Sequence, residues 1–202
     1  SFSGFFVSWL EWGTITHVGL WLPLILLSIN KLLSNKKNFR WRLIYLFSLL
    51  SSFFAGHLQI FFYILIFSWI YFFARWMQSG WQKKILFLFI ILNSLFIVIA
   101  AIQWIPTLQL ISLSARNVDV LDFNNPGWFI PWQHLIQFVA PDFFGNPTTL
   151  NYWGVWNYGE LVGYAGIVPL ILTFFAMFFR RDRKTLFFGT FFFLYLVFSL
   201  PT

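Results

Sequence analysis

The chain has 202 residues, of which 59% are hydrophobic, 24% aromatic and only 9% charged, and its net charge is +7. A soluble domain carries about 25% charged residues, so this composition excludes an ordinary water-soluble domain and indicates a protein solvated largely by lipid. The chain has no cysteine, which excludes a disulfide framework, a cysteine-ligated zinc and a cysteine nucleophile.

Apolar runs of membrane-spanning length cover 15–33, 43–74, 85–105, 161–179 and 185–200. A spanning helix needs about 20 residues, so four of these runs fit one helix each, the last of them being short. The run 43–74 does not fit, because a single helix of that length would measure about 48 Å against a hydrocarbon core of about 30 Å. We therefore predict a hairpin there, turning at 55–59 (AGHLQ).

The distribution of charge supports the hairpin. It places every acid except Asp182 on one side of the membrane, and every basic residue except Arg116 on the other. The positive-inside rule makes the basic side cytoplasmic. The basic charge thus reflects topology, and no basic cluster indicates nucleic acid as a partner. The cytoplasmic residues are Lys31, Lys36, Lys37, Arg40, Arg42, Arg75, Lys83, Lys84, Arg180, Arg181, Arg183 and Lys184.

The hairpin turn carries the polar residues His57 and Gln59 inside an otherwise apolar run. Each arm has about 15 residues, or about 23 Å, so the turn is expected below the outer surface, where exposed backbone must be buried in protein or line a wet cavity. Gly56 permits the sharp turn. Two readings stay open: His57 and Gln59 satisfy freed backbone groups, or they line a cavity open to the outside.

The predicted fold is an all-α polytopic integral membrane protein with about six membrane helices. The start at Ser1, without a signal-peptide pattern, and the apolar end indicate an internal piece of a longer protein. The order is an outer segment (1–14), a helix (15–33), the short hairpin (43–74), a helix (85–105), an outer region (106–160) and two helices (161–179 and 185–200).

The outer region is where chemistry is expected. Pro106 marks the end or a kink of the preceding helix, and TLQLISLSARN after it is expected along the interface. PWQHLIQFVAPDFFGNP predicts a short amphipathic helix that closes at Pro141. Aromatic residues crowd the segment after it. An interfacial aromatic belt accounts for most of them, and the alternative is that Trp153, Trp156 and Tyr158 stack on sugar rings.

Three charged residues are candidates for chemistry in this region. Arg116 is its lone basic residue; it suits a bidentate phosphate contact, or it pairs with a neighbouring aspartate. Asp142 and Glu160 could each act as general base or metal ligand, or could cap a helix. His134 is isolated, and no metal-ligand spacing, nucleophile elbow or phosphate loop occurs.

Several segments taken in order resemble the bacterial YfhO-type membrane proteins. They are AGHLQIFFY, QWIPTLQLISLSAR, LIQFVAPDFFGNP and NYWGVWNYGELVGYAGIVPLIL, with WLEWGTITHVGLWLPLILL as the preceding helix. The resemblance covers most of the chain and is specific through the order of the segments.

The resemblance implies a GT-C-type glycosyltransferase. Such an enzyme takes a sugar from a polyprenyl-phosphate carrier in the membrane and transfers it to a cell-envelope glycan on the outer face of the bacterial cytoplasmic membrane. In such an enzyme a carboxylate takes the acceptor proton or holds a divalent metal ion as cofactor. The principal catalytic acid of such enzymes usually lies in a first outer loop, which would precede Ser1. In this chain the base would be Glu160 or Asp142, and the phosphate contact would be Arg116. The cavity would be lined by the turn that carries His57 and Gln59.

Two rival functions remain open. A lipid-linked-sugar transporter or flippase would need ionisable groups at mid-membrane in several helices, whereas the helices after residue 85 hold only Asn93 and Gln103 as strongly polar residues. A non-catalytic envelope assembly protein would predict that Arg116 and Glu160 are dispensable.

Overall fold

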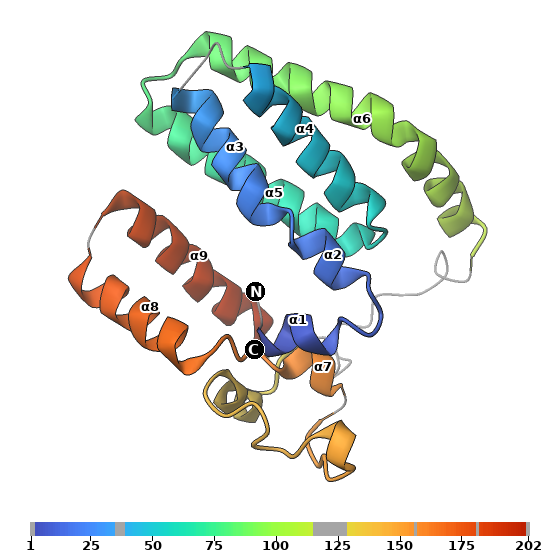
Figure 1. The fold of residues 1–202 in the computed structure, drawn as a ribbon, viewed down its shortest axis with the longest axis vertical. Helices are drawn as coiled ribbons and strands as arrows, with labels where there is room; N and C mark the ends of the chain where they lie inside the picture. Colours follow the sequence, from blue (N-terminus) through green and yellow to red (C-terminus); the bar gives the residue numbers. More distant parts are fainter. Residues whose placement is uncertain (1–2, 35–38, 115–128, 156, 181, 201–202) are drawn as a thin grey trace. The chain divides into compact units, whose positions relative to one another are not determined.

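The computed structural model describes residues 3–34, 39–114, 129–155, 157–180 and 182–200, and the regular structure within them is entirely helical (Figure 1). The chain divides into two compact units. We call Trp12–Val120 the helical unit, and Ser1–Glu11 together with Leu121–Thr202 the C-terminal unit. The all-α fold class predicted from composition is confirmed.

The helical unit is a bundle in which the successive helices α3, α4, α5 and α6 run in alternating directions (Figure 1). Helix α3 packs against both α4 and α5, and α4 also packs against α6 (Figure 1). Buried serines at the packing faces leave room for the backbones to approach one another. The helices are α2 (Ile15–Gly19), α3 (Leu22–Ser34), α4 (Phe39–Phe54), α5 (Leu58–Gln78) and α6 (Lys83–Ser112).

A few polar side chains pair within this apolar bundle. The indole of Trp69 donates to Asn93 Oδ1 at 2.9 Å, and the hydroxyl of Tyr45 lies 3.4 Å from the same oxygen. The Asn93 amide in turn donates to the carbonyl of Phe89 at 2.8 Å. These bonds join α4, α5 and α6 through groups that would otherwise be unpaired in a medium without water.

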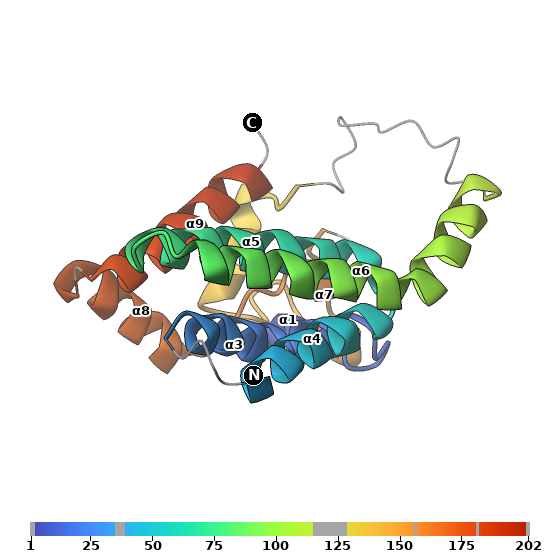
Figure 2. The same ribbon diagram turned by 90° about the horizontal axis from the view of Figure 1, so that it is seen from above.

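Two prolines change the predicted helices. The run 15–33 is interrupted between α2 and α3, because Pro23 has no N–H to continue the hydrogen-bond ladder. Pro106 lies inside α6, which continues to Ser112 and bends toward this end (Figure 2). The prediction that the helix covers 85–105 is therefore too short. Residues 106–112, which we placed in the outer region, form the last turns of α6.

The predicted hairpin is present, with unequal arms. Helix α4 ends at Phe54, Gly56 has a φ of +96°, and α5 begins at Leu58. Helix α5 has 21 residues, about 32 Å at about 1.5 Å per residue, so the expected arm of about 15 residues is wrong for α5. The helix runs past Arg75, whose Nε donates to Asn30 Oδ1 at 3.1 Å, and ends before Gly80, whose φ of +86° lies outside the right-handed helical region.

Within the described residues, three stretches are long and apolar enough to cross a membrane, judged by length and composition. A shorter apolar helix covers Ile167–Phe179. The chain thus has the segments of an integral membrane protein. The three stretches are Ile15–Ser34, Leu58–Gln78 and Lys83–Ser112.

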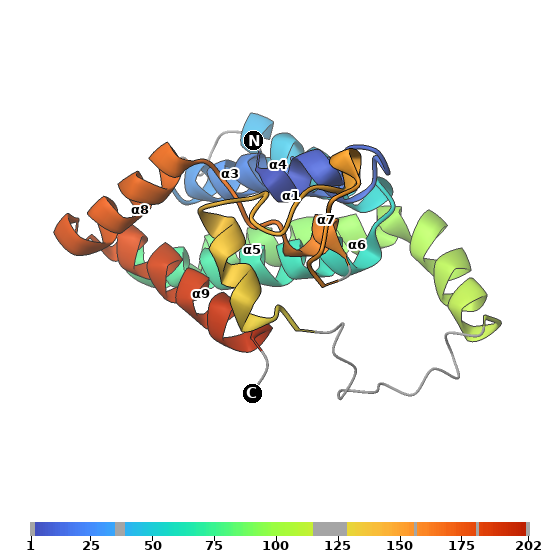
Figure 3. The same cartoon turned by 90° about the horizontal axis from the view of Figure 1, so that it is seen from below.

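The C-terminal unit combines short helices with one helical hairpin. Its first helix contacts α7, and the amide of Gly4 donates to the carbonyl of Tyr164 at 2.6 Å. Helices α8 and α9 lie side by side (Figures 1 and 3). The elements are α1 (Gly4–Ser8), the 3₁₀ helices η3 (Trp132–Phe138) and η4 (Pro147–Thr149), α7 (Tyr158–Leu161), α8 (Ile167–Phe179) and α9 (Arg183–Ser199).

The predicted helix over 161–179 is wrong in its first part. Helix α8 begins only at Ile167, because Gly166 has a φ of +101°, a conformation outside the right-handed helical region. The predicted helix over 185–200 corresponds to α9. Asp182 caps it, accepting from the amides of Lys184 at 3.0 Å and Thr185 at 2.9 Å.

Candidate functional site

The loop region of the C-terminal unit is built around a buried histidine. His134 lies on η3 with no exposed surface and stacks on Phe144, with ring centroids 4.3 Å apart. One ring nitrogen, Nδ1, lies 2.6 Å from Gln137 Oε1, and the other, Nε2, accepts from the amide of Val155 at 3.2 Å. These partners fix a tautomer with the proton on Nδ1. His134 is thus a structural residue that ties together 134–155.

A tight turn follows η3 and carries Asp142. The amide of Gly145 donates to the carbonyl of Asp142 at 2.9 Å, and Gly145 has a φ of +80°. A Cβ at Gly145 would lie 2.2 Å from the carbonyl oxygen of Asn151, so only glycine fits. Asn151 Oδ1 accepts from the amide of Asn146 at 2.9 Å, which holds the two sides of the loop together.

The carboxylate of Asp142 is exposed and held in place by two donors. Its Oδ1 accepts from the hydroxyl of Tyr158 at 2.9 Å and from the side-chain Nδ2 of Asn146 at 2.9 Å. Burial raises the pKa of Tyr158 to about 12, with the bond to Asp142 as the next contribution. Tyr158 therefore stays a donor at neutral pH. Both bonds use the same oxygen, so among the described residues Oδ2 is left for a proton or a ligand.

Aromatic side chains flank this carboxylate. Tyr152 meets Tyr158 edge to face with centroids 5.5 Å apart, and its hydroxyl donates to the carbonyl of Val155 at 2.5 Å. Burial raises the pKa of Tyr152. The rings of Trp153 and Phe144 pack edge to face with centroids 4.8 Å apart, and 67% of Trp153 is exposed. An exposed flat ring on the same loop as an exposed carboxylate is an arrangement that suits a sugar.

The structure brings together only some of the predicted site residues. Asp142 and Tyr158 are hydrogen-bonded, and Trp153 lies on the loop between them. Glu160 is exposed in the first turn of the four-residue α7. The predicted phosphate contact Arg116 lies outside the described residues. The predicted sugar-stacking residue Trp156 is likewise outside them.

The residues predicted to line a cavity belong to the helical unit. His57 is the N-cap of α5, and its Nδ1 accepts from the amide of Ile60 at 3.4 Å. The side chain of Gln59 is exposed and donates to the hydroxyl of Tyr63 at 3.1 Å. For His57, the structure thus shows the first of the two readings, a bond that satisfies freed backbone. The cavity reading stays a prediction.

Two groups at the site were missed by sequence reasoning. Asn146 both holds Asp142 and caps η4 by accepting from the amide of Thr148 at 2.9 Å. The signal was present, because asparagine directly before Pro147 is typical of a helix start. Tyr152 was considered only as part of an aromatic belt. Its role could not be read from the sequence, because it depends on the loop folding back on itself.

A divalent metal ion does not fit the described part of this site. Within the described ranges, no three histidine, aspartate or glutamate side chains gather. Asp142 is the one carboxylate of the loop turn, and Oδ1 already accepts two hydrogen bonds. Metal ions of the hard, oxygen-binding class need several such ligands.

Comparison with known proteins agrees with the membrane character of the chain. The family model described as bacterial membrane protein YfhO matches residues 1–202. Neither a curated protein nor a solved structure matches the chain significantly. The match covers the whole chain, and it includes both the helical unit and the loop that carries Asp142. The chain therefore belongs to the YfhO family of bacterial membrane proteins.

Proposed function

We propose that the chain is part of a membrane glycosyltransferase that uses a polyprenyl-phosphate-linked sugar. The acceptor is a cell-envelope glycan on the outer face of the cytoplasmic membrane. Membership of the YfhO family and the apolar spanning helices are compatible with this activity. The observation that carries the proposal is the exposed carboxylate of Asp142, oriented by Tyr158 and Asn146.

The proposed reaction needs a base close to the acceptor. The acceptor hydroxyl oxygen attacks the anomeric carbon of the donor sugar, and the bond from that carbon to the phosphate oxygen breaks. The proton of the hydroxyl passes to a carboxylate, and the polyprenyl phosphate leaves with the bonding electrons. We assign the proton to Asp142 Oδ2, because Oδ1 is engaged by Tyr158 and Asn146.

Two further groups complete the proposal. Trp153 presents an exposed ring on the same loop and is the proposed sugar platform. Arg116 is the proposed partner of the leaving phosphate, since a guanidinium suits a phosphate geometrically. In this proposal the loop region faces outside and the basic loops face the cytoplasm, as the charge distribution predicts.

The test is sugar transfer in liposomes that contain the purified protein and a radiolabelled polyprenyl-phosphate sugar. Asp142→Asn is the informative variant, because the asparagine oxygen can keep both hydrogen bonds on Oδ1 while the basic carboxylate is lost. Glu160→Gln is its matched control, a carboxylate of the same region that is exposed in α7. We expect Asp142→Asn to lower the rate by about 100-fold or more, the usual contribution of general base catalysis.

Other outcomes would redirect the proposal. A loss confined to Glu160→Gln would move the base to Glu160. Transfer that both variants leave intact would place the base outside this region. Movement of labelled lipid between leaflets without transfer to an acceptor would favour the flippase instead.

A further inference from the structure

A groove of about 650 Å³ lies between α8 and α9, entirely within the C-terminal unit. Most of its wall is apolar, and the small residues Ala176 and Gly189 belong to this wall. This volume falls in the range of sites that hold one ligand of moderate size. The apolar wall includes Pro169, Leu172, Met177, Phe188 and Phe192.

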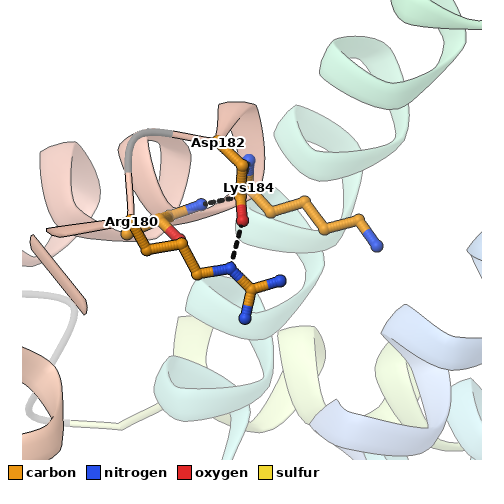
Figure 4. A network of polar contacts seen from close by, with 4 residues as sticks. Arg180, Asp182 and Lys184 are labelled. Atoms are coloured by element: carbon orange, nitrogen blue, oxygen red, sulfur yellow. Dashed lines mark hydrogen bonds and ion pairs between the residues drawn. The ribbon is translucent and has the colours of Figure 1, made fainter.

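One end of the groove is polar and basic. Arg180, Asp182, Lys184 and Thr185 line it at the turn between the two helices (Figure 4). Asp182 is fully used inside the protein. Its Oδ1 accepts from the amides of Lys184 and Thr185, and its Oδ2 accepts from Arg180 Nε at 2.5 Å. The hydrogen bond from the amide of Thr185 is the largest of the contributions that lower the pKa of Asp182, and the bond from Arg180 adds to it. Asp182 is therefore ionised at neutral pH.

The cations at this end are only partly neutralised. Asp182 engages Arg180 through Nε alone, so within the described part of the turn the two terminal nitrogens of its guanidinium remain available. The side chain of Lys184 is exposed and extends away from Asp182 (Figure 4). Arg183 adds a further exposed positive charge at the start of α9. The described residues of the turn therefore carry three positive charges and one negative charge.

An apolar groove that ends in excess positive charge has the pattern of an amphiphile with an anionic head. Basic residues at the end of a membrane helix lie at the level of lipid headgroups. We propose that the α8–α9 groove binds one anionic phospholipid of the bilayer, with its phosphate between Arg180 and Lys184 and an acyl chain along the apolar wall. This lipid is distinct from the sugar donor, whose phosphate is proposed to meet the loop region predicted on the other side of the membrane.

Native mass spectrometry of the purified, delipidated protein tests the proposal. The protein is titrated with phosphatidylglycerol and, separately, with phosphatidylcholine carrying the same acyl chains. We expect one phosphatidylglycerol to be retained per chain. Replacing Arg180→Gln and Lys184→Gln together is expected to weaken it by about 30-fold, given the usual attraction of each basic residue for anionic lipid. Ala176→Phe is expected to reduce retention as well, by filling the groove.

The matched control removes the same charge elsewhere. Lys83 and Lys84 are exposed at the start of α6 in the helical unit, so Lys83→Gln with Lys84→Gln is expected to leave retention unchanged. An equal loss in this control would reduce the effect to diffuse charge attraction and overturn the proposal. Equal retention of phosphatidylcholine would overturn the choice of an anionic head, and displacement by polyprenyl phosphate would assign the groove to the carrier lipid. A change of oligomeric state with Ala176→Phe, without lipid loss, would make a second copy the occupant.

Discussion

Replacing Gly145 with alanine is expected to open the loop that carries Asp142. Gly145 has a φ of +80°, which L-residues rarely adopt. The new Cβ would stand 2.2 Å from the carbonyl oxygen of Asn151 and 2.9 Å from its Oδ1. Both neighbours belong to the loop itself, so the clash cannot be relieved by the rotation of a flexible side chain alone.

The magnitude follows from two contributions. A left-handed backbone conformation costs a non-glycine residue about 1–2 kcal/mol. Moving Asn151 away would also break the bonds that its Oδ1 accepts from the amide of Asn146 at 2.9 Å and the hydroxyl of Thr149 at 2.7 Å. Each such bond contributes about 0.5–1.5 kcal/mol. We expect the loop to lose about 2–5 kcal/mol of local stability.

Limited proteolysis with chymotrypsin measures this local stability. Phe144 is only 5% exposed, so cleavage after it requires the loop to open. In the regime where opening is fast, the cleavage rate follows the population of the open form and should rise by roughly 30-fold to 4,000-fold in Gly145→Ala.

The control is Gly189→Ala in the same unit. A Cβ at Gly189 would lie 3.8 Å from Met177 Cε, an ordinary contact, and its φ is helical. We expect no change in cleavage after Phe144 for this variant. If Gly145→Ala were cleaved no faster than wild type, the described geometry of the Asp142 turn would be wrong.

Further substitutions and conditions probe the two units separately. His134→Leu fills the space of the ring but leaves the amide of Val155 without its acceptor, so cleavage after Phe144 should accelerate by about 10-fold or more. The control is Trp132→Leu, a substitution at an exposed position of the same helix. Asn93→Leu removes the hydrogen-bond partner of the Trp69 indole and the Tyr45 hydroxyl in the helical unit, which should destabilise the folded state by about 1–3 kcal/mol. The midpoint of thermal unfolding at a fixed scan rate should therefore fall, and an unchanged midpoint would contradict the network. Folding raises the pKa of Tyr158 from 10.0 to about 12. The protonated hydroxyl of Tyr158 therefore contributes fully to loop stability below pH 10, and this contribution is lost as the pH rises toward 12. Cleavage of the loop should accelerate over that interval, and should do so less in Tyr158→Phe.

The helix content of the chain could be predicted because apolar runs and charge patterns are local properties. The turn at 55–59 was located by run length and charge, and Gly56 lies in it with a φ of +96°. Helix ends were less accessible. Helix α5 passes Arg75, the residue at which the apolar run stops, and ends before Gly80, whose φ is +86°. Apolar composition alone therefore does not mark where a helix ends.

The residues of the site were predictable one by one, but their contacts were not. Asp142 and Tyr158 could be selected as single residues of suitable chemistry, and the structure joins them by a hydrogen bond of 2.9 Å. That they meet depends on the Gly145 turn and on the buried His134, which together fold the loop back. His134 was interpreted from the sequence as an isolated histidine, because its partners Gln137 and Val155 are assembled only by tertiary structure.

The most direct test of the central claim is a double-mutant cycle on sugar transfer, with Asp142→Asn, Tyr158→Phe and both together. If Tyr158 acts by orienting the Asp142 carboxylate, each single change slows transfer, Asp142→Asn by about 100-fold or more. Tyr158→Phe should then have no further effect once the carboxylate is gone. Transfer at the wild-type rate by Asp142→Asn, or equal slowing by Tyr158→Phe in both backgrounds, would contradict the claim.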